Sequence, residues 1–152
     1  MRLIYAILIV ILFFGCSAKE RKNRNVYWDR NNTVEIVNHM SAAFLTAPVI
    51  KEKCYNSYML GTVVNNTYDH LDTKKLMQMI TLRLTQNGLI FVQNNAEVKF
   101  MGKISALYQK NQATKDMFYL FTLSLVDTKT DTVVWIETVP IRKVSIKPLV
   151  GW

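Results

Sequence analysis

The sequence has few of the residues from which most catalytic and redox sites are built. Its 152 residues include only two histidines and two cysteines, and these have no spacing typical of a zinc site. The five glycines are scattered singly along the chain, so they form no phosphate-binding loop. No nucleophile, base and orienting side chain stand in a recognisable set. We therefore expect a protein that is not an enzyme and that holds no metal and no cofactor.

Glycine and proline are also scarce, at five and three residues, which excludes collagen-like and Pro/Gly-rich disordered chains. The hydrophobic content of 50% is that of a packed globular protein, and the length fits one domain. Acidic residues number 11 against 19 lysines and arginines, giving a net charge of +8. This excess favours an anionic neighbour, such as a membrane surface, nucleic acid or an acidic polymer.

The chain lacks an apolar run long enough to cross a membrane. Residues 3–14 are apolar, whereas a membrane-spanning helix needs about 20 residues. A basic start, a short apolar run and then small residues are typical of a secretory signal. Cys16, directly after Gly15, resembles the acylated cysteine of a bacterial lipobox. We predict a signal peptide over residues 1–15, with an uncleaved hydrophobic anchor as the alternative.

Lipid attachment at Cys16 would anchor the mature chain to a membrane. Because Ser17 rather than Asp follows the cysteine, we expect the outer membrane, with the protein facing the periplasm. A protein exported in this way would rarely meet nucleic acid, so no nucleic-acid partner is expected. Cys54 is then the only other cysteine, which excludes an intramolecular disulfide. We interpret Cys54 as a small, half-buried hydrophobic residue.

Residues 16–31 are predicted to be a flexible lipidated tether that reaches at most about 50 Å. The stretch is basic and has no apolar periodicity. Tyr27 and Trp28 stand out in it, and they either dock back onto the domain or lie at the membrane interface. Asn31, followed by Asn32 and Thr33, resembles a glycosylation acceptor. We favour a different role for Asn32 and Thr33, as the cap of the next helix.

Residues 32–152 are predicted to form one domain that mixes helices and strands. Val34, Val37, Met40 and Phe44 recur at the spacing of an amphipathic helix. Residues 58–64 are short, apolar and partly β-branched, which predicts a buried strand before a turn at 65–67.

A second helix is predicted between a cap at Asp72-Thr73 and a left-handed end at Asn87-Gly88. Residues 89–92 are predicted to be the next strand, which makes residues 58–92 a β-α-β unit. A crossover of this length favours parallel strands in one sheet.

The C-terminal third is predicted to be β. Residues 98–108 alternate loosely, and residues 118–126 and 133–139 form a hairpin around 127–131. The alternation places Tyr119, Phe121, Leu123 and Leu125 on one face. Pro140 is expected to end the pairing, leaving a basic tail over 141–152.

Two segments of the chain resemble the LpoB family of outer-membrane lipoproteins, which activate penicillin-binding proteins. The first runs from Leu60 through the turn and second helix to Val92, and the second covers residues 118–127 and 134–143. Asp131 stands where the family's hairpin usually has glycine. The positions that match the family pattern, which we expect to serve the fold first, are Gly61, Asn65, Asn66, Thr67, Asp72, Thr73, Trp135, Arg142 and Lys143.

The resemblance implies an α+β (mixed α/β) domain similar to the N-terminal domain of TolB, with a small mixed sheet of four to five strands and two helices. It also implies a periplasmic protein partner, a class A penicillin-binding protein or an envelope complex, which the protein binds and regulates. The alternative is a structural lipoprotein of a secretion, pilus or flagellar envelope complex. The short tether and the aromatic C-terminus favour this alternative.

Overall fold

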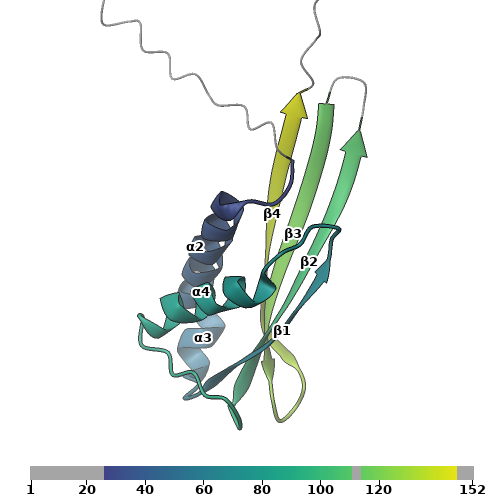
Figure 1. Ribbon diagram of the computed structural model, residues 1–152. Coiled ribbons are helices and arrows are strands. Elements are labelled where there is room, and N and C mark those ends of the chain that lie inside the picture. Colours follow the sequence, from purple (N-terminus) through teal and green to yellow (C-terminus); the bar gives the residue numbers. More distant parts are fainter. Residues whose placement is uncertain (1–25, 111–113, 147–152) are drawn as a thin grey trace, which may run out of the picture.

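The computed structural model describes residues 26–110 and 114–146, which fold into one sheet with helices on one side (Figure 1). The strands stand in the order β1-β2-β3-β4, with β1 and β2 parallel and the other pairs antiparallel. This confirms the predicted mixed α+β fold with two main helices. In chain order the elements are α2 (Arg30–Thr46), α3 (Pro48–Lys53), β1 (Tyr58–Asn66), α4 (Thr73–Thr85), β2 (Val98–Lys110), β3 (Thr114–Asp127) and β4 (Val133–Ile146).

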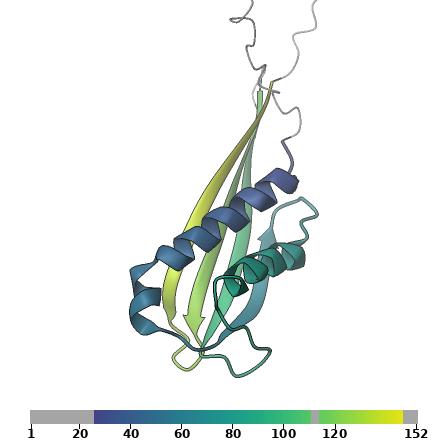
Figure 2. The same ribbon diagram turned by 90° about the vertical axis from the view of Figure 1, so that its left-hand side faces the viewer.

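The helices cover one face of the sheet, and the other face is open (Figures 1 and 2). The covered face carries the predicted β3 stripe from Tyr119 to Leu125, whose alternate side chains are fully buried. Helix α4 buries Leu76, Met77, Ile80 and Leu84 against it. None of the helices in the described part of the chain is long and apolar enough to cross a membrane.

Phe44 of α2 lies at the centre of the core. Its ring meets Phe100, Trp135 and Tyr58 at centroid distances of 5.0, 5.1 and 6.0 Å. Aromatic pairs with these spacings add to the free energy gained by burying the rings. Trp135, one of the family-pattern positions, is therefore a core residue.

The predicted stripe of α2 was wrong at one end. Val34 is 40% exposed, whereas Ile36, Val37, Met40 and Phe44 are buried. A helix turns by 100° per residue, so positions 36, 40 and 44 align over the sheet and position 34 lies off that line.

The predicted strand at residues 89–92 was also wrong. Only an isolated bridge joins Phe91 to Tyr58, through hydrogen bonds of Tyr58 with the backbone of Ile90 and Val92 on the outer edge of β1. The chain then turns, with Asn95 in left-handed geometry at φ 57°, and returns as β2, the parallel partner of β1. The short apolar segment therefore covers a sheet edge instead of joining the sheet.

Contrary to the expectation from the sequence, Pro140 does not end the strand pairing. It lies opposite Leu120, and β4 continues to Ile146. Because β4 is an edge strand, alternate backbone N–H groups face away from the sheet, and a proline is tolerated at such a position. Residues 141–146 of the predicted tail therefore belong to the sheet.

The domain begins before the predicted boundary at residue 32. Val26 is buried and Trp28 docks on the ring of Tyr119 at 5.3 Å, so Trp28 follows the first of its two predicted alternatives. Helix α2 begins at Arg30 and its N-cap residue is Asp29, while the side chain of Asn32 takes part in the cap from inside the helix, as predicted. Residues 26–31 are thus part of the folded domain, not of a tether.

Three smaller predictions have clear outcomes. Asp72 caps α4 by accepting a hydrogen bond from the backbone of Lys75 at 2.8 Å, and Gly88 has the left-handed φ of 91° expected at a helix end. Asp131 adopts left-handed geometry at φ 54°, as a residue replacing a hairpin glycine must. The prediction for Cys54 was wrong, because this residue is exposed and ends α3.

Gly61 lies at a close approach between β1 and β2. A Cβ atom there would meet the Sδ of Met101 and the carbonyl oxygen of Phe100, each at 2.5 Å. The register shift between Leu60 and Val63 falls on the same residues. The glycine is therefore required by packing, in agreement with a structural role.

We predict that Gly61→Ala lowers the free energy of unfolding by about 1–3 kcal/mol, because the added methyl overpacks the β1–β2 contact. Denaturant titration of the purified domain measures this. Thr62→Ala, at the exposed neighbouring position, serves as the control and should change stability by no more than about 0.5 kcal/mol. Equal losses in the two variants would contradict the proposed close approach.

Candidate binding groove

The structure separates the family-pattern positions into three groups. Gly61 and Trp135 support the core, and Asn65, Thr67, Asp72 and Thr73 surround one end of α4. Arg142 and Lys143 lie on β4. Asn66, at the end of β1, is exposed. Cys16 lies outside the described residues.

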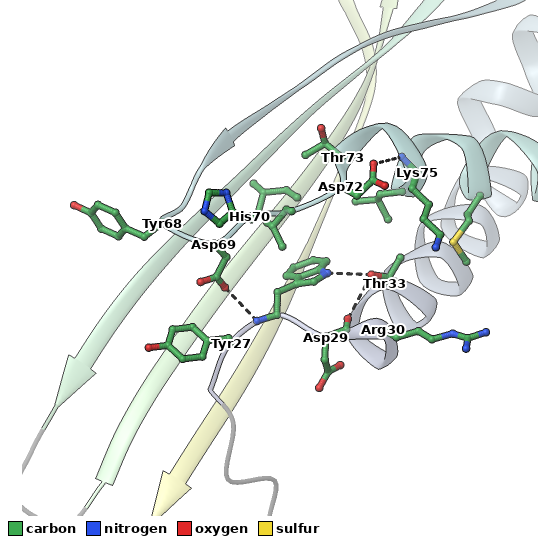
Figure 3. A pocket seen from close by; sticks show the side chains of 15 residues that line it. Tyr27, Asp29, Arg30, Thr33, Tyr68, Asp69, His70, Asp72, Thr73 and Lys75 are labelled. Atoms are coloured by element: carbon green, nitrogen blue, oxygen red, sulfur yellow. Dashed lines mark hydrogen bonds between the residues drawn. The ribbon is translucent and has the colours of Figure 1, made fainter.

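A groove of about 750 Å³ opens between the start of α2 and the loop that leads from β1 into α4 (Figure 3). The segment 27–33 forms one wall and residues 68–76 form the other. Aromatic, cationic and apolar side chains alternate around it. Those with the most bearing on binding are Tyr27, Arg30, Tyr68, His70, Lys75 and Met79.

The loop wall of the groove is held by hydrogen bonds among its own residues. The side-chain oxygen of Asn65 accepts from the backbone N–H and the hydroxyl of Thr67, at 3.0 and 2.8 Å. The amide of Asn65 donates to the carbonyl of Asp69 at 3.0 Å. The hydroxyl of Thr67 in turn accepts from the backbone of Asp69 at 3.1 Å. Asn65 and Thr67 thus fix the position of Asp69.

Asp69 joins the loop to the other wall and to the sheet. One carboxylate oxygen accepts from the backbone N–H of Trp28 at 3.1 Å and from the hydroxyl of Tyr119. Burial and the Asp69 carboxylate raise the pKa of Tyr119 well above its usual value, so this hydroxyl stays protonated and donates. The Tyr119 hydroxyl also lies 3.3 Å from the carbonyl oxygen of Val26.

Lys143 of β4 binds the wall formed by residues 27–33. Its buried ammonium donates to the carbonyl of Tyr27 at 2.8 Å, to Asp29 at 2.5 Å and to the side-chain oxygen of Asn32 at 3.0 Å. An ammonium has three N–H groups, so all of its donors are used. We call this set (Tyr27, Asp29, Asn32 and Lys143) the lysine clamp.

Asp29 serves both the clamp and α2. Its other oxygen accepts a hydrogen bond from the backbone N–H of Asn32 at 3.1 Å. The side-chain oxygen of Asn32 in turn accepts from the backbone N–H of Asp29, which completes a capping box. Burial tends to raise the pKa of Asp29, but the hydrogen bonds from Lys143 and the helix backbone lower it on balance. The carboxylate therefore stays ionised beside the ammonium.

Arg142 is placed differently from its neighbour. It is largely exposed on the open face, where it pairs with Asp116 at 2.7 Å and lies over the ring of Phe118 at 5.2 Å. The Arg142 side chain is 60% exposed and the Asp116 side chain 15%, so water screens this pair from the side of the guanidinium. The two adjacent basic residues thus have different environments, one holding the fold and one facing solvent.

The groove has the composition of a binding surface. Its inner polar groups (Asp69, Asp72, Thr33) are engaged with backbone or neighbouring side chains, while Tyr68 is fully exposed and Tyr27 is 59% exposed at the rim. In the described ranges no three His, Cys, Asp or Glu side chains gather where a metal ion could bind. His39 lies elsewhere, 3.4 Å from Glu137.

Sequence reasoning missed the residues that connect the groove walls. Asp69 was given no role there, and Tyr119 was treated only as one apolar position of a stripe. The one available signal was the hydroxyl of Tyr119, which needs a partner when it is buried on an otherwise apolar face. That partner is more than 40 residues away in the chain, so spacing could not identify it.

We predict that Lys143→Met lowers the free energy of unfolding by about 2–3 kcal/mol, because it leaves the partly buried Asp29 without its counter-ion. Arg142→Met is the comparison on the same strand and should cost less, about 1 kcal/mol, because the exposed Arg142 side chain makes one hydrogen bond, to Asp116, whereas the buried ammonium of Lys143 makes three. Chemical denaturation at neutral pH compares the two. A similar loss in both variants would contradict the assigned role of Lys143.

The ion pair between Asp29 and Lys143 predicts a pH dependence of stability. Because folding lowers the pKa of Asp29 below its ordinary value of 3.8, the unfolded chain binds more protons in this range, and stability rises with pH. The contribution is fully present above about pH 5 and is lost as the pH falls through the folded pKa. Lys143→Met should flatten this acid limb relative to Arg142→Met, as measured by thermal unfolding from about pH 5 to pH 2.

Comparison with known proteins places the chain in a family. Residues 32–101 and 92–141 match the family described as "Peptidoglycan-synthase activator LpoB". No curated protein matches the chain.

Several solved structures are similar to it. The LpoB C-terminal domain from Escherichia coli has 12% identity and a TM-score of 0.49, covering 69% of this chain and 94% of that domain. The domain from Salmonella enterica has 13% identity and a TM-score of 0.45, covering 75% and 98%. Lipoprotein GNA1162 from Neisseria meningitidis has 12% identity and a TM-score of 0.46, covering 59% and 83%.

The family match extends over residues 32–141, and thus over most of α2, all of α4, strands β1 to β3 and the first part of β4. The chain therefore belongs to the LpoB family of peptidoglycan-synthase activators.

Proposed function

We propose that this protein is a lipid-anchored envelope protein that binds a peptidoglycan synthase and raises its activity without taking part in the chemistry. The family match over residues 32–141 carries this proposal. Binding accelerates the synthase if the protein has a higher affinity for the active state than for the inactive one. A class A penicillin-binding protein is the partner proposed.

Lipid attachment at Cys16 would hold the domain close to a membrane. Val26 is buried in the domain and lies ten positions after Cys16, a reach of about 35 Å when fully extended. This is shorter than a tether ending at residue 31 would allow. We propose that the anchor lies in the outer membrane and that the synthase meets the domain close to that surface.

The groove is the docking surface that we propose for the synthase. Exposed tyrosines and arginine are the residue types that contribute most to binding at protein interfaces. Tyr68 and Tyr27 point outward at one side of its rim, and Arg30 and Lys75 lie at the other side (Figure 3). The hydrogen bonds of Asp69 and the lysine clamp hold both walls, so little conformational entropy would be lost on binding.

The test uses the chain from Ser17 onward, added to a purified class A synthase in detergent. The unmodified chain should raise the rate of glycan polymerisation. Tyr68→Ala should raise the concentration needed for half-maximal stimulation by about 30-fold, the loss typical of an interface hot spot. Tyr108→Ala, which removes an exposed tyrosine that does not line the groove, is the matched control and should leave stimulation unchanged.

Absence of stimulation by the unmodified chain would contradict the proposed activity. Equal effects of Tyr68→Ala and Tyr108→Ala would instead contradict the groove as the docking surface. The rival function is a structural part of a secretion, pilus or flagellar envelope complex, and the short connection between Cys16 and Val26 favours it. Cross-linking in cells that recovers such components and no glycan synthase would support this rival.

A further inference from the structure

Strands β2, β3 and β4 continue past the helices and past the end of β1 as a narrow three-stranded tongue (Figures 1 and 2). We define the tongue as residues 107–110, 114–118 and 142–145, which pair in register across the three strands. The last fully buried side chains before it are Ile104 and Tyr119. The tongue therefore lies outside the hydrophobic core.

The tongue nevertheless carries apolar side chains on both faces, among polar and charged ones. Leu107 pairs with Phe118 on the open face, and Tyr108 pairs with Met117 on the opposite face. Leu107 is 59% exposed and Tyr108 is 47% exposed. The start of α2 contacts the base of the tongue at Lys143, and further along the strands no helix within the described residues covers either face (Figure 2). A surface of this kind indicates an interaction site.

The charge of the tongue is basic. Lys110 lies directly opposite Lys115 in the antiparallel register. Arg142 is paired with Asp116 and Lys143 with Asp29, so the excess positive charge of the tongue comes from Lys110 and Lys115. Like charges placed opposite each other across a strand pair reduce stability. An anionic surface at this position would remove that penalty.

The tongue lies at the end of the domain where the chain from the proposed anchor enters. Lys143, which pairs with Met117 at the base of the tongue, also binds the carbonyl of Tyr27. The segment before Val26 carries Lys19, Arg21, Lys22 and Arg24. With Cys16 in the membrane, this end would lie within about 35 Å of the lipid surface.

We propose that the tongue docks on an anionic lipid surface. Leu107 and Phe118 enter the boundary between headgroups and acyl chains, Tyr108 lies at headgroup level, and Lys110 and Lys115 reach lipid phosphates through their flexible stems. The docked tongue orients the domain so that the groove, on the helix side of the sheet, stays free for its partner. This inference rests on the membrane anchor of the proposed function but not on the synthase.

The test measures co-sedimentation of the chain from Ser17 onward with vesicles of phosphatidylcholine, alone or with about 30% phosphatidylglycerol. The wild-type chain should bind the anionic vesicles at least about tenfold more tightly than the neutral ones, and salt should weaken this binding. All variants keep the basic segment before Val26, so that its contribution to binding is constant.

Two pairs of variants locate the contact. Leu107→Asn should weaken binding about tenfold, because it removes an apolar side chain from the lipid boundary. Ile136→Asn is its matched control, because Ile136 is 60% exposed on the same open face but far from the tongue; it should bind like wild type. Lys110→Gln with Lys115→Gln should weaken binding to anionic vesicles about 30-fold, whereas Lys129→Gln, in the hairpin at the opposite end, should not.

Unchanged vesicle binding in both tongue variants would overturn the proposal. If these variants instead lose synthase stimulation, or turn a dimeric chain monomeric while still binding vesicles, the occupant of the tongue is a protein and the proposal also fails. Circular dichroism confirms that each variant is folded. Because the vesicle assay contains no synthase, a lack of vesicle binding would not contradict synthase activation. A lack of synthase stimulation would likewise not contradict docking of the tongue on lipid.

Discussion

The ammonium of Lys143 connects the parts of this domain that would otherwise be held only by loops. It rises from the last strand of the sheet and binds the segment before α2, the cap of that helix and a residue of its first turn. A buried cation is costly unless all of its donors are used and a counter-ion is near, and both conditions are met here. The position of α2, and with it one wall of the groove, depends on this arrangement.

Asp69 forms the corresponding connection on the other wall, again through backbone and hydroxyl groups. The groove is therefore bounded by two segments that are each tied to the sheet by a charged side chain. Its inner polar groups are used in holding these walls, and its rim exposes aromatic and cationic side chains. Such a division is suited to binding a partner with little rearrangement, which agrees with the activator function proposed.

The proposed groove contact and the proposed membrane contact use different parts of the same end of the molecule. The groove lies between the start of α2 and the loop from β1 to α4, and the tongue extends past the helices from beside it (Figures 1 and 2). The lysine clamp stands between them, because Lys143 starts in the tongue and ends at the groove wall. A lipid surface and a protein partner could therefore be bound together, with the clamp fixing the angle between them.

The sequence by itself determined the elements with strong local patterns: the β3 stripe, the Asp72 cap, the left-handed positions at Gly88 and Asp131, and the family. Local propensity and side-chain period decide these features, so neighbouring residues suffice. Only the tertiary structure decided that residues 89–92 cover an edge, that β4 continues through Pro140, and that Trp28 and Asp29 belong to the domain. Each of these depends on a partner far away in the chain, and Lys143 shows why: its three acceptors lie more than 100 residues before it, where no sequence spacing could indicate a contact.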